Sequence, residues 1–155
     1  MRLATPEDFS AATDPFLRPY LEYQPCGVEY SASLLESFTY ATGLLASRLN
    51  RREHMLIIIG DPPFEIPLNK NKIVFYPGED TYATTLHGVI FLRIDQLLRC
   101  NPNEQVVVIL EELVHGVMGI SDELLARKIV AHMIPGLVLT EKGYDLRELD
   151  RVSLV

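Results

Sequence analysis

Hydrophobic residues along the chain change between helical spacing and short continuous runs, and this pattern predicts the order of the elements. Between residues 34 and 49 the apolar positions recur at helical spacing, which predicts a helix capped by Ser31 or Ser33. Short apolar runs predict strands at 55–59, 72–76 and 89–94. Further helices are predicted at 96–99 after a capping Asp95, at 102–118, and from Ser121 to Pro135. Because the strands cluster between helices, the pattern favours an α+β fold over a repeating βαβ unit.

The two ends of the chain are less regular than its middle. Residues 1–30 contain four prolines, spaced too closely for long regular structure, together with several aromatic and leucine side chains. We therefore expect residues 1–30 to form a proline-rich N-terminal arm that packs across a single domain at 31–155. From Thr140 onward the chain is polar, and its pattern is weakly helical.

Composition narrows the class of protein. The chain has 155 residues, 48% of them hydrophobic and 23% charged, which is typical of one globular domain with its own core. No apolar run approaches the ~18 residues that span a bilayer, and no signal-peptide segment opens the chain. Cys26 and Cys100 make no disulfide framework, so we expect a cytoplasmic protein. A net charge of −7 argues against a nucleic-acid partner, because binding phosphates needs a basic surface.

The segment 104–118 carries the candidate chemistry. Its apolar residues cover most of the helix circumference and leave one narrow stripe of Glu111, Glu112 and His115. Glu111 and His115 stand one turn apart, and Glu112 lies about 60° from His115 around the helix axis. These side chains on a buried helix must pair, bind a cation or line a wet cleft. The plain alternative is that the stripe faces water.

The run Glu111-Glu112-Leu113-Val114-His115 resembles the active-site helix of zincin metallopeptidases, whose motif is HExxH. In that family two histidines bind zinc and the glutamate between them activates a water molecule. By resemblance, Glu112 matches the catalytic base and His115 the second metal ligand, while Glu111 replaces the first histidine. A carboxylate can also bind zinc, so Glu111 remains a candidate ligand.

The resemblance covers residues 31–136 and implies a minimal zincin-like α+β domain with a small sheet packed on the motif helix. It implies a zinc cofactor and a peptide or protein substrate, held in extended form along the last strand, at 89–94. In the glutamate-ligand branch the third ligand comes from the following helix, which maps to Glu123. Asp122 and Glu141 are alternatives, and the helix dipole alone also favours acids in a first turn.

Replacing a histidine by Glu111 changes the expected chemistry. A less positive site activates water less, and oxygen-rich ligation shifts the preferred metal toward iron or manganese. Three hypotheses follow: a metal-dependent peptidase with Glu112 as base, an inactive zincin-fold interaction module, and a non-hydrolytic metal-binding protein. The sequence 112–115 is also half of a di-iron ExxH motif, but a second copy is missing. We expect His132 to be a core residue rather than a ligand, and the sequence leaves the oligomeric state open.

Overall fold

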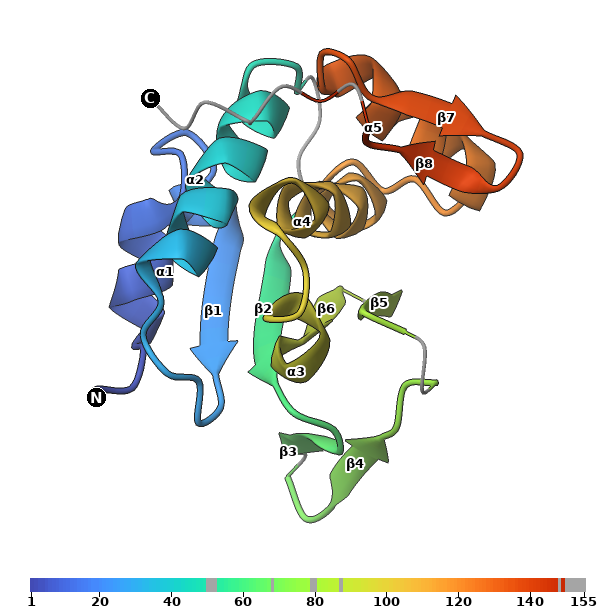
Figure 1. Cartoon of the computed structure of the whole chain (residues 1–155). Helices are drawn as coiled ribbons and strands as arrows, with labels where there is room; N and C mark the ends of the chain where they lie inside the picture. The colour runs from blue at the N-terminus through green and yellow to red at the C-terminus, as the bar shows by residue number, and fades with distance from the viewer. Residues whose placement is uncertain (50–52, 68, 79–80, 87, 148, 150–155) are drawn as a thin grey trace.

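The computed structural model describes residues 1–49, 53–67, 69–78, 81–86, 88–147 and 149, and these form an α+β protein (Figure 1). The helices are α1 (Pro6–Ala12), α2 (Ala32–Ala46), α3 (Ile94–Leu97), α4 (Pro102–Val117) and α5 (Glu123–Met133), with a short 3-10 helix at Arg18–Tyr20. The strands are β1 (Leu21–Pro25), β2 (Met55–Gly60), β3 (Phe64–Pro67), β4 (Lys72–Phe75), β5 (Ala83–Leu86), β6 (Val89–Arg93), β7 (Val138–Thr140) and β8 (Gly143–Asp145).

The main sheet has the strand order β1-β2-β6-β5. Strands β1, β2 and β6 run parallel, and β5 pairs with β6 in antiparallel register. The strand predicted at 89–94 is therefore internal, and the expectation that an extended substrate is held along it is wrong. The strands at the two edges of the sheet are β1 and β5, and β5 is the one beside β6.

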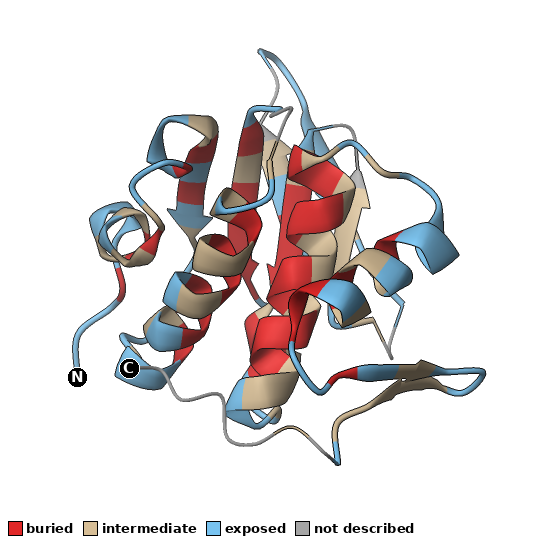
Figure 2. Ribbon diagram, turned by 90° about the horizontal axis from the view of Figure 1, so that it is seen from above, coloured by how far each residue is buried: buried red, intermediate tan, exposed pale blue. Residues whose placement is uncertain are grey.

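Alternation along β2 explains how both faces of the sheet are covered. Ile57 and Ile59 point into the main core beneath the helices, and Figure 2 shows α4 buried along most of its length. Ile58 points to the opposite face, where it packs with Phe91 and with Phe64 of the β3–β4 hairpin. The near-continuous apolar run of β2 thus reflects a strand buried on both sides. Among the described residues, no helix is long and apolar enough to cross a membrane.

The N-terminal segment contributes more regular structure than its prolines suggest. Residues 21–25, inside the expected arm, form β1 and pair with β2. Before it, α1 places Phe9 in the core, where its ring stacks on Tyr23 and meets Phe38 edge to face. This strand is not predicted from the sequence, because the closely spaced prolines conceal its pattern.

Other differences concern caps and the tail. Arg93, not Asp95, is the N-cap of α3, and Asp122, not Ser121, is the N-cap of α5. Strand β4 pairs with β3 in a separate hairpin and not with the main sheet. Residues 138–145 form the β7–β8 hairpin, so the prediction of weak helicity from Thr140 is wrong for this part of the tail, while residues 148 and 150–155 lie outside the described part of the chain.

Candidate metal centre

Helix α4 sets the position of the polar stripe. It begins at a capping box formed by Asn101 and Glu104. Near its other end, Gly116 lets the helix approach the sheet closely: a Cβ atom there would lie 2.6 Å from the Met55 side chain and 3.1 Å from that of Ile90. The buried apolar residues therefore hold α4 against β2 and β6, with the stripe of acids and histidine at one side.

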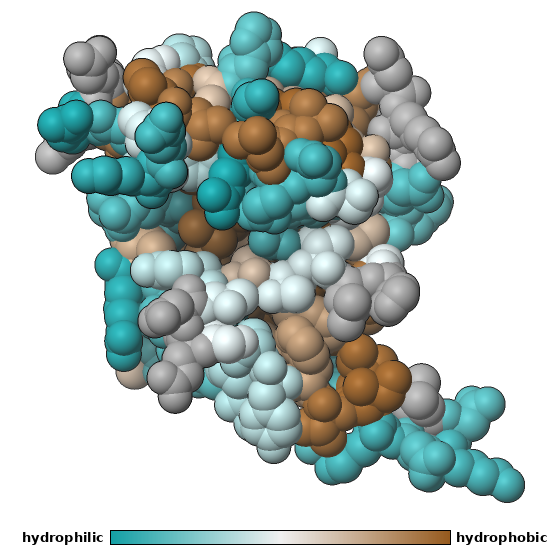
Figure 3. Space-filling view, turned by 90° about the vertical axis from the view of Figure 1, so that its right-hand side faces the viewer, coloured by the Kyte–Doolittle hydropathy of each residue, from teal (hydrophilic) through white to brown (hydrophobic). Residues whose placement is uncertain are grey.

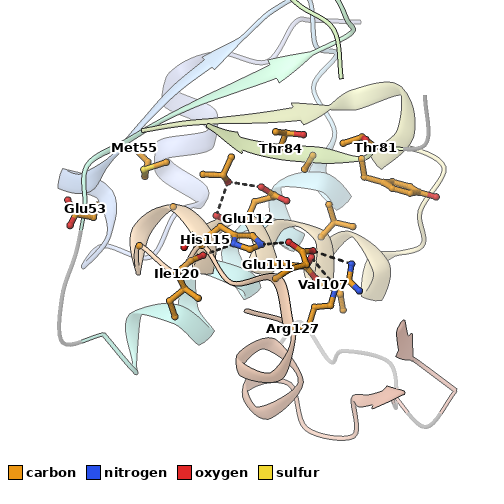
Figure 4. A pocket seen from close by; sticks show the side chains of 18 of the residues that line it. Glu53, Met55, Thr81, Thr84, Val107, Glu111, Glu112, His115, Ile120 and Arg127 are labelled. Carbon is orange, nitrogen blue, oxygen red and sulfur yellow. Dashed lines mark hydrogen bonds and ion pairs between the residues drawn. The ribbon is translucent and has the colours of Figure 1, made fainter. Parts of the chain in front are cut away.

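A cleft of about 970 Å³ opens along this stripe. Its walls come from α4, the strand β5, the first turns of α5 and the β7–β8 hairpin (Figure 4). Figure 3 views this side of the molecule, where apolar surface gathers in two places with a paler band between them. Large apolar side chains are exposed on α5 and β7 (Leu124, Leu125, Val138) and on β4 (Ile73, Val74).

Three of the predicted site residues converge in the cleft. Glu111, His115 and Glu123 each offer one ligand atom, and these atoms all lie within 4.8 Å of one another. Gly119, with a φ of 67°, ends the segment after α4 and allows the chain to return so that α5 starts beside His115. Ligand atoms around a tetrahedral zinc ion lie about 3.4 Å apart, so small side-chain rotations would enclose a cation.

The imidazole of His115 is held in the orientation that a metal ligand requires. Its Nδ1 lies 2.6 Å from the carbonyl oxygen of Ile120, and because a carbonyl can only accept, Nδ1 carries the proton. In the neutral ring Nε2 then bears a lone pair, and it lies 3.2 Å from Oε2 of Glu123. Two lone pairs at this separation require a proton or a cation between them. A protonated ring would form an ion pair with Glu123, and a neutral ring leaves a lone pair that can bind a divalent metal.

Glu111 has a mixed environment. Tyr144 of β8 donates a hydrogen bond of 2.5 Å to its Oε2, and Arg127 Nε lies 3.8 Å from its Oε1. Burial raises the pKa of Glu111 and neighbouring Glu123 raises it further, while Tyr144 and Arg127 act in the opposite direction. Burial and the carboxylate together raise the pKa of Tyr144, so it remains a protonated donor.

Arg127 reaches both carboxylates of the cluster. Its Nη2 lies 3.1 Å from Oε1 of Glu123, one turn earlier on α5, in addition to the longer contact with Glu111. The side chain of Arg127 is 42% exposed and that of Glu123 57% exposed, whereas Glu111 is only 15% exposed. The guanidinium thus lies at the mouth of the cleft, between two acids that would otherwise repel each other.

Glu112 points to the other side of the stripe, toward β5. Thr85 donates a hydrogen bond of 2.6 Å to its Oε2. Burial raises the pKa of Glu112 to about 7, against the lowering effect of the Thr85 hydrogen bond and of His115. A carboxyl group with such a pKa can both take up and release a proton near neutral pH.

The alternative ligands lie elsewhere. Asp122 accepts a hydrogen bond of 2.6 Å from the Leu125 amide as the α5 cap. Glu141 is in the turn between β7 and β8, and it is not among the described residues that line the cleft. His132 is exposed on α5, so the expectation of a core histidine is wrong; only one face of this helix is buried.

Sequence reasoning missed three residues that contact the carboxylates: Thr85, Arg127 and Tyr144. For Tyr144 a signal existed, because a polar turn ending in Gly143 separates it from the apolar Val138 and Leu139, which is typical of a hairpin. Thr85 carried no such signal, since a threonine on a strand is common for packing reasons alone.

Comparisons of the chain with family models, with curated protein sequences and with solved structures found no match.

Proposed function

We propose that this protein is a zincin-like, metal-dependent hydrolase that cleaves peptides. The observation that carries the proposal is the convergence of Glu111, His115 and Glu123 in one cleft, which Glu112 lines from the side of β5. Each of these four residues has the side chain that its role requires: three metal ligands and one proton acceptor.

A divalent ion in this cluster would supply a Lewis acid that polarises a carbonyl group and lowers the pKa of water. Glu112 would accept the proton of the attacking water and later release it to the leaving amine. Its hydrogen bond from Thr85 fixes the carboxyl orientation, and its pKa of about 7 suits both steps. Tyr144 would hold Glu111 in place through its hydroxyl group.

The surroundings of the cleft favour an extended peptide as substrate. β5 lines the cleft, and among the described residues it pairs on one side only, with β6. An extended chain can add to such a free edge through backbone hydrogen bonds. Apolar residues of the cleft lining, such as Val107, Val108 and Ile120, offer contacts for its side chains. The predicted substrate position thus moves from 89–94 to β5.

The charge of the ligand set favours a slow hydrolase over a fast one. Two carboxylates and a neutral imidazole would cancel the charge of a divalent ion, so bound water should deprotonate less readily than at a histidine-rich site. The same oxygen-rich set is compatible with iron or manganese as well as zinc.

The test is hydrolysis of a casein or peptide mixture by the protein reconstituted with zinc, manganese or ferrous iron. Glu112→Gln should abolish cleavage while retaining the metal, because the amide that replaces the carboxylate cannot accept the proton. Glu141→Gln removes an exposed acid elsewhere and should cleave like the wild type. Cleavage that survives Glu112→Gln, or no cleavage with any metal bound, contradicts the proposed hydrolysis.

A second candidate is a non-hydrolytic protein with this fold, either metal-binding or an interaction module. The contacts of Arg127 with Glu111 and Glu123 favour it, because the two carboxylates already have a cationic partner within the chain. Stoichiometric metal without cleavage would support the metal-binding form. Failure to bind any of the three metals would support the interaction module.

A further inference from the structure

We propose that Arg127 is a built-in substitute for the cation: its guanidinium neutralises Glu111 and Glu123 in the metal-free protein and competes with a metal ion for them. This inference rests on the metal site of the proposed function and identifies the residue that sets its affinity. The competition needs no hydrolysis, so it can be tested separately.

The contacts of the guanidinium coincide with those that a cation would make. Nη2 is 3.1 Å from Oε1 of Glu123 and Nε is 3.8 Å from Oε1 of Glu111. These are two of the three side chains in the candidate metal cluster. The planar fork of arginine can face two carboxylates at once, which the single ammonium of a lysine cannot do equally well.

Charge repulsion disfavours simultaneous binding of the Arg127 guanidinium and a metal ion to the two carboxylates. Without a cation, the carboxylates of Glu111 and Glu123 approach each other in a half-buried cleft, which is unfavourable unless positive charge lies nearby. A divalent ion bound between them would repel the guanidinium at its present distance. The 42% exposed Arg127 side chain lies at the cleft mouth, so it can turn toward solvent at small cost.

Two consequences follow for the site. Ions with weak affinity for a carboxylate-rich set, such as magnesium, would fail to displace the arginine. Ions higher in the affinity order of divalent metals, such as zinc, would succeed. Arg127 therefore raises the metal concentration that is needed to fill the site. It also selects among metals without being a ligand itself.

The experiment is a zinc titration of the full chain, by calorimetry and by competition with a chromophoric chelator. Arg127→Gln should tighten zinc binding about five- to tenfold, because two partly exposed ion pairs no longer have to be broken. Arg127→Lys should tighten it by less, and it serves if the glutamine variant does not fold.

Lys142→Gln is the matched control. Lys142 also lines the cleft, but its ammonium group has no ion pair among the residues that the structure describes. Removing it lowers the charge equally and should leave zinc affinity within about twofold of the wild type.

Distinct outcomes separate the two proposals. Tighter zinc binding by Arg127→Gln, including binding that only this variant shows, supports the competition. Equal or weaker binding by Arg127→Gln, or an equal gain in Lys142→Gln, overturns the competition but leaves the metal site intact. Absence of zinc binding in every variant overturns both the competition and the metal site.

Discussion

Replacing the buried carboxyl group of Glu112 by an amide should stabilise the metal-free protein in a pH-dependent way. The pKa of Glu112 is raised from 4.5 to about 7, mainly by burial. The folded chain therefore holds this proton more tightly than the unfolded chain does. Between these pH values unfolding releases a proton, and the free energy of unfolding falls as the pH rises.

The magnitude follows from the same pKa change. A rise from 4.5 to about 7 corresponds to a loss of at most about 3 kcal/mol of stability by pH 8, compared with pH 4. Glu112→Gln removes this loss and keeps an oxygen that can accept the Thr85 hydrogen bond. The variant should match the wild type within about 1 kcal/mol near pH 4.5 and exceed it by about 1–3 kcal/mol at pH 8.

Urea unfolding in the presence of a chelator, at several pH values from 4.5 to 8, measures this difference. Comparing variant with wild type cancels the titration of all other groups. A difference that stays constant with pH, or a variant that loses stability at pH 8, would refute the assignment of Glu112 as a buried, destabilising carboxylate.

Three further substitutions test individual contacts. Thr85→Val should cost about 1–2 kcal/mol at pH 8, measured by urea unfolding, because the Glu112 carboxylate loses its donor; no loss would show that water replaces the hydroxyl. Tyr144→Phe should cost about 1–2 kcal/mol and expose the β7–β8 hairpin to limited proteolysis, since its bond to Glu111 is lost; unchanged proteolysis would contradict this. Asp122→Ala should cost about 1 kcal/mol as a lost helix cap but leave zinc affinity unchanged; weaker zinc binding would instead indicate a ligand.

The sequence predicted the elements with strong periodicity and missed those that depend on tertiary pairing. The motif helix and the strand at 55–59 follow from their own patterns, and the structure has both, as α4 and β2. Strand β1 and the β7–β8 hairpin are short, and they depend on partners far away or just across a turn. Local pattern carries little information about such pairing.

The site was predictable where one helix determines it. Glu111 and His115 share a face of α4 by helical geometry alone. The approach of Glu123 depends on the turn at Gly119, and the resemblance rather than the spacing suggested it. The turn at Gly143 indicates the hairpin that carries Tyr144, but no local signal specifies that α5 and β8 fold back over the end of α4, which brings Arg127 and Tyr144 to the cluster.

The most direct test of the account is the metal stoichiometry of the full chain and of its ligand variants after dialysis against zinc. We predict one equivalent of zinc in the wild type, and at least about tenfold weaker binding when either His115→Ala or Glu123→Gln removes a ligand. Glu141→Gln should retain the wild-type stoichiometry. Absence of bound metal in both the wild type and Arg127→Gln, or a His115→Ala variant that binds zinc as tightly as the wild type, would contradict a shared cation site at Glu111, His115 and Glu123.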